Sequence, residues 1–404
     1  MQLEKQAKGK TITLITLIVA GESIYFLPFV LARVFRPTLL EFFEISNTEL
    51  GLWFSLYGVV AMVSYVLGGP LADRFPARKL MAYALWLTSA GGVLMSLVPS
   101  SRAMLLLYAF WGFTTVCLFW AAFIRATREW GGLDFQGRAF GWLEGGRGGV
   151  AALLATLSVL LFSQIRSFQW VILAITAITL VSGIMVWVFI PNRSPVRSGT
   201  RSKEVFRTVS KLLRMRNTWL LSIIIVCAYV GYKITDDFSL FAREVLGFSE
   251  VNAAGIGTIA LWMRAVVAIL AGYLADRFNR IGVIVVSFAL TLAGGLLLGL
   301  EIFQGVSTLL LLNLALTAAG IYGLRALYFA VMKEAKIPVD ITGTAVGLVC
   351  FVGFAPEIFI SPWMGHLLDR TPGAAGHADV FMLLSAFALA GLVAGLLFRR
   401  SVSS

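Results

Sequence analysis

Long apolar runs follow one another along almost the whole chain, and they constrain its fold more than any other feature. The runs Trp170–Ile190, Ile281–Leu300 and Val380–Phe398 each reach the ~20 residues with which an α-helix crosses a bilayer. Charged residues make up 13% of the chain, whereas soluble domains carry roughly 25%. The sequence therefore predicts an all-α polytopic membrane protein.

Charged and turn-rich breaks divide the apolar runs into twelve predicted transmembrane helices. The longest polar break, residues 191–217, leaves six of these spans on each side. We therefore expect two six-helix bundles, in 1–190 and 218–404, joined by a basic linker in 191–217. The predicted spans are 12–35, 50–71, 80–98, 103–125, 138–163, 168–190, 218–242, 253–274, 281–300, 306–332, 343–368 and 379–398.

The basic residues predict how the chain is oriented. Of the 33 Lys and Arg residues, 23 lie at the two termini and in the even-numbered loops, and five lie in the odd-numbered loops. Because cytoplasmic loops carry the excess of Lys and Arg, both termini and the linker are expected in the cytoplasm, with the protein in a bacterial inner membrane. This distribution accounts for the net charge of +12 without a nucleic acid as partner.

The sequence offers little of the chemistry that enzymes and metal centres use. Cys117, Cys227 and Cys350 lie in apolar segments without a pairing pattern, and the two histidines are His366 and His377. A Gly-rich nucleotide loop and a Ser/His/Asp set with spare histidines are missing from the sequence. We expect a protein that is not an enzyme and that holds no metal and no cofactor.

Two similar loops predict an internal repeat. LADRF occurs at Leu71–Phe75 and again at Leu274–Phe278, which is an offset of 203 residues. At an offset of 206 residues, FQGRAFG in 135–141 meets ITGTAVG in 341–347. A repeat of this length indicates two related, pseudo-symmetric bundles.

Two bundles of six spans, with G-x-L-A-D-R after spans 2 and 8, resemble the major facilitator superfamily of secondary transporters. The resemblance implies the major facilitator fold, a lipid bilayer as surroundings, a monomer, and a small-molecule substrate that is carried by alternating access. DDFSLFAREV in 236–245 and QGRAFGWLEGGRGG in 136–149 also look like segments of the organophosphate:phosphate antiporter branch. That branch is known for one substrate-binding arginine in each half, and the nearest basic residues here are Arg33 and Lys233.

Apart from Arg125, Arg138 and Asp379 at the terminal positions of spans, ten charged residues are predicted to lie inside spans. All ten are in spans that this architecture places around a central cavity. Intramembrane charges are costly and are expected to face the bundle interior or a watery cavity. The predicted spans 3, 6, 9 and 12, which the architecture turns toward lipid, contain none except Asp379 at the first position of span 12. The ten residues are Glu22, Arg33, Glu144, Arg147, Lys233, Asp236, Asp237, Arg264, Arg325 and Glu357.

The cations among these residues are candidates for substrate binding, because a guanidinium binds phosphate, sulfonate or carboxylate through two hydrogen bonds. The candidates are Arg33, Lys233, Arg264 and Arg325, with Tyr25 and Tyr232. Helical spacing places Glu22, Tyr25, Phe29 and Arg33 in one stripe, and Tyr229 with Lys233 and Asp236 or Asp237 in another. The candidates for proton coupling or charge pairing are Glu22, Asp236, Asp237, Glu144, Arg147 and Glu357.

More ordinary explanations remain open for the same charges. Lys233 can pair with Asp236 and Asp237 on its own helix, and Glu144 can meet Arg147 three residues further on. Arg33 can snorkel to the membrane interface. The loop residues Asp73, Arg74, Asp276 and Arg277 lie at cytoplasmic helix ends. There a carboxylate can accept hydrogen bonds from a helix N-terminus, so we expect them to act in gating.

The sequence thus predicts a secondary transporter of a small organic anion, coupled to protons or to exchange as a symporter or antiporter. One alternative is a proton-coupled exporter of hydrophobic or cationic compounds. Another is a membrane receptor that does not transport. Substrate identity and the direction of transport stay open at this point.

Overall fold

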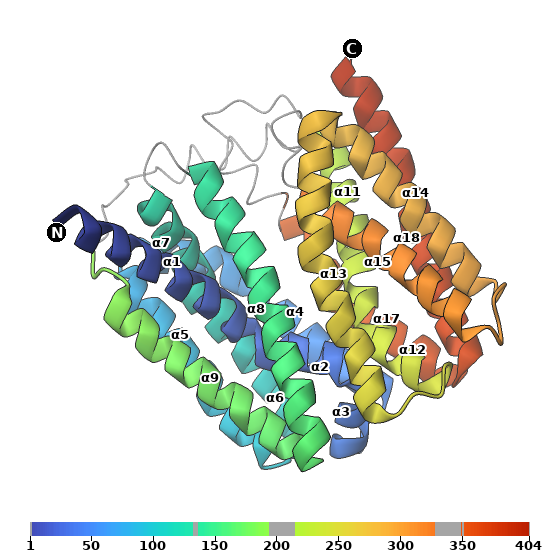
Figure 1. The fold of residues 1–404 in the computed structure, drawn as a ribbon, viewed down its shortest axis with the longest axis horizontal. Helices are drawn as coiled ribbons and strands as arrows, with labels where there is room; N and C mark the ends of the chain where they lie inside the picture. The colour runs from blue at the N-terminus through green and yellow to red at the C-terminus, as the bar shows by residue number, and fades with distance from the viewer. Residues whose placement is uncertain (1, 132–135, 194–214, 328–348, 350, 404) are drawn as a thin grey trace. The chain divides into compact units, whose positions relative to one another are not determined.

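A computed structural model describes residues 2–131, 136–193, 215–327, 349 and 351–403 (Figure 1). Within these residues the regular structure is helical throughout, and no β-strand occurs. Backbone amide and carbonyl groups find no water in the hydrocarbon of a bilayer, so a spanning segment satisfies them within its own helix. The predicted all-α architecture is confirmed.

The helices of the first half of the chain are α1 (Gln2–Tyr25), α2 (Leu31–Val34), α3 (Arg36–Phe43), α4 (Asn47–Ala72), α5 (Ala77–Ser96), α6 (Ser101–Gly112), α7 (Ala121–Gly131), α8 (Gln136–Ile165) and α9 (Phe168–Phe189). Those of the second half are α11 (Arg216–Ile234), α12 (Phe238–Glu244), α13 (Glu250–Arg277), α14 (Arg280–Gly299), α15 (Ser307–Leu327), α17 (Pro356–Arg370) and α18 (Ala374–Ser403).

Ten helical segments of the described chain are long and apolar enough to cross a membrane. They correspond to ten of the predicted spans. Of the other two, span 3 corresponds to α5, which is 20 residues long, and span 11 contains α17, whose preceding residues 328–348 lie outside the described chain.

Internal contacts divide the chain into two compact units. Unit 1 comprises Met1–Ile45, Leu52–Ser198 and Ser249–Trp262, and unit 2 comprises Ser46–Gly51, Gly199–Phe248 and Met263–Ser404. The boundary therefore crosses α4 between Gly51 and Leu52. The predicted linker includes residues 194–214, which lie outside the described chain, so the predicted domain limits stay a prediction.

Each unit has its own core, in which small residues let helices approach closely. In unit 1, α5 packs along α9, and a Cβ atom added at Gly92 would clash with Thr176 Oγ1. In unit 2, α14 packs against α15 and α18. A Cβ atom added at Gly391 would clash with the Phe288 ring. These contacts hold the helices within each unit at fixed distances.

Three spans change their winding partway along. A π-helical segment, Phe26–Val30, follows α1 and contains Pro28, and a second one, Phe113–Trp120, joins α6 to α7. A 3₁₀ segment, Thr235–Asp237, joins α11 to α12. Proline has no amide hydrogen for the helical ladder, and such irregular turns are frequent at functional sites.

The π segment alters one expectation from the sequence. The predicted stripe from Glu22 to Arg33 assumes 3.6 residues per turn. Because Phe26–Val30 is wound as a π-helix, that spacing does not continue from α1 into α2. Glu22 and Arg33 therefore do not belong to one regular α-helical stripe.

Candidate functional site

Unit 2 contains a buried cluster centred on Lys233. The Lys233 Nζ atom lies 3.0 Å from Asp236 Oδ2 and 3.1 Å from Glu357 Oε1, and the Lys233 side chain is 1% exposed. Asp236 belongs to the 3₁₀ segment, three residues further on, whereas Glu357 comes from the first turn of α17. A buried ammonium needs such partners, because the desolvation of an ion costs several kcal/mol.

Aromatic residues complete this cluster. The Tyr229 hydroxyl donates a hydrogen bond to Glu357 Oε2, so both oxygens of this carboxylate are engaged. The guanidinium carbon of Arg325, from α15, lies 3.8 Å from the centre of the Tyr232 ring, which is close enough for a cation–π interaction. The structure thus brings together the predicted residues Lys233, Asp236 and Glu357, and it pairs Arg325 with Tyr232.

The sequence offered both Asp236 and Asp237 as partners of Lys233. Of these two, Asp236 contacts Lys233 in the structure, and Asp237 contacts a different residue. Its Oδ2 atom lies 2.7 Å from Nδ1 of His377, at the start of α18. The other ring nitrogen, Nε2, lies 3.2 Å from Oε2 of Glu244. Successive residues of a 3₁₀ turn point in directions about 120° apart, so the two aspartates reach different partners.

Unit 1 contains a second cluster, centred on Arg147 of α8, in which Arg147 and Glu22 are buried and the Glu144 side chain is 55% exposed. The Arg147 Nε atom lies 3.3 Å from Oε2 of Glu22 in α1, and its Nη1 atom donates a hydrogen bond of 2.8 Å to Glu144. The guanidinium carbon lies 5.8 Å from the ring centre of Tyr25 and 5.9 Å from that of Phe123. The predicted residues Glu22, Tyr25, Glu144 and Arg147 are therefore brought together.

Three buried arginines lie elsewhere. Arg33 in α2 is 1% exposed, so it does not snorkel to the interface, and Arg264 in α13 is 6% exposed. Arg36, which begins α3 and is also 1% exposed, was predicted to lie in a loop. The adjacent Pro37 could have indicated that a helix begins here, because proline is favoured in the first turn of a helix.

The two LADRF loops differ in structure. In the first copy α4 ends at Ala72, and Arg125 of α7 donates hydrogen bonds through Nη1 to the carbonyl groups of Ala72 and Phe75. In the second copy the helix continues to Arg277, and Asp276 lies 3.6 Å from Arg280 Nη2. The gating role of Asp73, Arg74, Asp276 and Arg277 stays a prediction.

Asp369 forms a contact that the sequence did not predict. Its carboxylate accepts hydrogen bonds from the backbone amides of Asn47, at 3.0 Å, and Thr48, at 2.7 Å, and from the Asn47 side chain, at 3.2 Å. It therefore caps the first turn of α4, a segment that belongs to unit 2. Burial raises the pKa of Asp369, but the hydrogen bonds from Thr48 and Asn47 outweigh this effect, and the pKa lies below its usual range.

We expect Asp369→Asn to lower the melting temperature of the detergent-purified protein at pH 7.5, because one amide would then face the Asn NH₂ group. Loss of a helix cap costs about 1 kcal/mol. The folded-state pKa is depressed, so the stabilisation is present above the unfolded pKa of about 3.9 and is lost as pH falls through the folded value. The difference from wild type should thus begin to shrink as pH falls below about 4 and should disappear once pH is below the folded-state pKa. Asp379→Asn, at an exposed aspartate, is the matched control, and an equal shift in that variant would contradict the capping role.

A membrane-embedded helical protein with ion pairs buried where spans change their winding has the architecture of a transport protein. The family model described as "Major Facilitator Superfamily" matches residues 14–335. The chain belongs to this superfamily, and the predicted family and fold class are confirmed.

Curated relatives match over nearly the full chain. The inner membrane protein YqcE of Escherichia coli K12 is 28% identical over 389 residues, covering 92% of this chain and 90% of the relative. The inner membrane protein YihN of the same organism is 25% identical over 399 residues, covering 96% and 94%. A glycerol-3-phosphate transporter of Bacillus subtilis is 24% identical over 386 residues, covering 85% and 83%.

Solved structures share the fold at low sequence identity. A point mutant of the nucleoside transporter NupG superposes with a TM-score of 0.75 and 13% identity over 96% of this chain and 99% of its own. A bacterial homologue of the human lysosomal transporter Spinster superposes with a TM-score of 0.73 and 16% identity over 97% of both chains.

Proposed function

We propose that this superfamily member carries a small organic anion across an inner membrane by alternating access, with both termini in the cytoplasm. The observation that supports the substrate class best is the shared Lys233 ammonium, held by Asp236 and Glu357 at 3.0 and 3.1 Å. An ammonium that two carboxylates share can bind the anionic group of a substrate in place of one carboxylate. That carboxylate can then become neutral by taking up a proton.

Coupling to protons follows from the charges of this cluster. Two carboxylates share one ammonium. When a phosphate, sulfonate or carboxylate takes over the ammonium, one side-chain carboxylate loses its cation, and the burial that disfavours its charged form favours proton uptake.

Further support for an anionic substrate comes from Arg325 and from one relative. The Tyr232 ring covers one face of the Arg325 guanidinium, and a guanidinium suits the recognition of phosphate, sulfonate or carboxylate. One relative is named a glycerol-3-phosphate transporter, and a phosphate monoester is an anion of the proposed class.

The cluster in unit 1 favours a second candidate, a proton-coupled exporter of hydrophobic or cationic compounds. Glu22 and Glu144 share the single guanidinium of Arg147, next to the aromatic rings of Tyr25 and Phe123. Carboxylates beside aromatic faces suit an organic cation.

A ligand screen distinguishes these candidates. We expect glycerol 3-phosphate, a small sulfonate or a dicarboxylate to raise the melting temperature of the purified protein, and tetraphenylphosphonium to leave it unchanged. The stabilising compound should then enter proteoliposomes, and an inward proton gradient should increase its accumulation. Stabilisation by tetraphenylphosphonium alone would favour the exporter. Binding of an anion without any flux would favour a receptor.

A further inference from the structure

A cavity lies at one end of unit 1, apart from both charge clusters. Its volume is about 460 Å³, and residues from the start of α1, the start of α5, α7 and the end of α9 line it. Ligand pockets in proteins measure roughly 300–1,000 Å³, so this cavity can hold the headgroup of a lipid or a small molecule.

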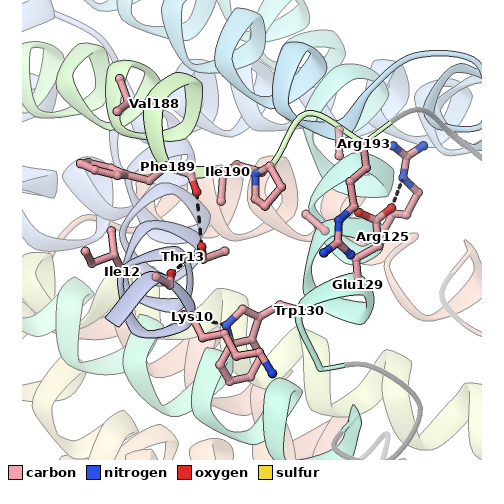
Figure 2. A pocket seen from close by; sticks show the side chains of 14 residues that line it. Lys10, Ile12, Thr13, Arg125, Glu129, Trp130, Val188, Phe189, Ile190 and Arg193 are labelled. Carbon is pink, nitrogen blue, oxygen red and sulfur yellow. Dashed lines mark hydrogen bonds and ion pairs between the residues drawn. The ribbon is translucent and has the colours of Figure 1, made fainter. Parts of the chain in front are cut away.

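The lining of the cavity is divided by polarity. Figure 2 shows Arg125, Glu129 and Arg193 on one side, and Ile12, Val188 and Phe189 on the other. The three apolar side chains are 42%, 60% and 43% exposed, respectively. In a membrane protein, apolar side chains that are this exposed at the end of a span are available to acyl chains.

The lining of the cavity as a whole has an excess of cations. Lys10, Arg125 and Arg193 line the cavity together with one acid, Glu129. Glu129 Oε1 lies 3.1 Å from Arg125 Nε, so Lys10 and Arg193 supply the additional positive charge. Counting of basic residues along the sequence places all three cations at the cytoplasmic surface.

The remaining polar groups of the cavity fix its walls. The Trp130 indole donates a hydrogen bond of 2.8 Å to the carbonyl of Lys10, and Thr13 Oγ1 lies 3.3 Å from the carbonyl of Phe189. These bonds tie α1 to α7 and to the end of α9, so the cavity is held open between three spans. Arg125 also holds the first LADRF loop through the carbonyls of Ala72 and Phe75.

From this geometry we infer that the cavity binds an anionic phospholipid of the cytoplasmic leaflet. The phosphate lies against Lys10, Arg125 and Arg193, and an acyl chain lies along Ile12, Val188 and Phe189. Basic pockets between spans on the cytoplasmic side suit anionic headgroups, and the adjoining exposed apolar wall favours a lipid over free phosphate. This site is independent of the substrate proposed above.

The test uses the full-length protein in dodecyl maltoside micelles with phosphatidylglycerol, phosphatidylcholine or inorganic phosphate as probes. Native mass spectrometry counts the lipids retained, and melting temperature reports affinity. The variant Lys10→Gln/Arg193→Gln removes two exposed cations of the cavity. Its matched control, Arg102→Gln/Arg166→Gln, removes two exposed arginines of odd-numbered loops. Val188→Ser tests the apolar wall without changing the charge.

We expect one phosphatidylglycerol to bind wild type and the control variant in preference to phosphatidylcholine. The Lys10→Gln/Arg193→Gln variant should bind it about thirtyfold more weakly, which corresponds to about 1 kcal/mol for each cation. Val188→Ser should weaken the binding as well. Equal binding of the two lipids, equal affinity of the cavity and control variants, saturation by inorganic phosphate, or an unchanged Val188→Ser would each overturn the proposal.

Discussion

Replacing Lys233 with methionine is expected to abolish anion binding and transport while the protein still inserts and folds. The change leaves Asp236 and Glu357 without their shared ammonium, but each acid can take up a proton and become neutral. A fixed cation cannot be restored by protonation, and loss of a buried charge partner for a ligand costs about 2–5 kcal/mol. We therefore expect affinity for the stabilising anion to fall about a hundredfold or more.

Binding to monodisperse protein, measured by calorimetry, and counterflow in proteoliposomes check this prediction. Lys233→Arg is the matched control, because it keeps the charge but changes its length and geometry, and it should retain part of the binding. If Lys233→Met bound the wild-type ligand with unchanged affinity, Lys233 would be only an ion-pair partner, and the anion-binding role would be wrong.

The second large effect concerns stability. Asp236→Asn and Glu357→Gln should each cost little, about 1 kcal/mol, because one carboxylate still faces the Lys233 ammonium in either variant. The double variant leaves a buried ammonium without either carboxylate, which should cost about 3–5 kcal/mol. The double loss should therefore exceed the sum of the single losses, as expected for residues that share a partner.

Melting temperature and the yield of folded protein measure these losses. The triple variant Lys233→Met/Asp236→Asn/Glu357→Gln provides the decisive control, because it removes the cation as well. Neutral replacement of a buried ionic triad is often tolerated, so stability should return close to that of wild type. Additive losses in the double variant, or a triple variant as unstable as the double, would contradict the shared-ammonium interpretation.

Contacts within one helix were predictable from the sequence. Spacing of three residues predicted the Lys233–Asp236 pair and the Glu144–Arg147 pair, and both are observed. These predictions succeed because helical geometry fixes which neighbours along the chain share a face.

Contacts between helices were not predictable from spacing. Glu357 lies 124 residues from Lys233, and His377 lies 140 residues from Asp237, so only the packing of the spans brings them together. Asp369 and Arg125 bind backbone groups, which leave no trace in residue identity. The π segments were missed for a related reason, since Pro28 alone signals one of them and the other contains no proline.

The first span of each half departs from α-helical winding in a different way, so the two halves are not symmetric in detail. Unit 1 has a π segment at Phe26–Val30, where unit 2 has a 3₁₀ segment at Thr235–Asp237 somewhat further along. A π turn holds more residues than a 3₁₀ turn, so residues matched by a constant offset, such as Arg33 and Asp236, differ in height and in rotation about the helix axis. Each half therefore arranges its charged residues differently, with Arg147 central in unit 1 and Lys233 central in unit 2. Exchanging side chains between equivalent positions of the two halves is accordingly expected to destroy recognition, even though both halves keep the same order of spans.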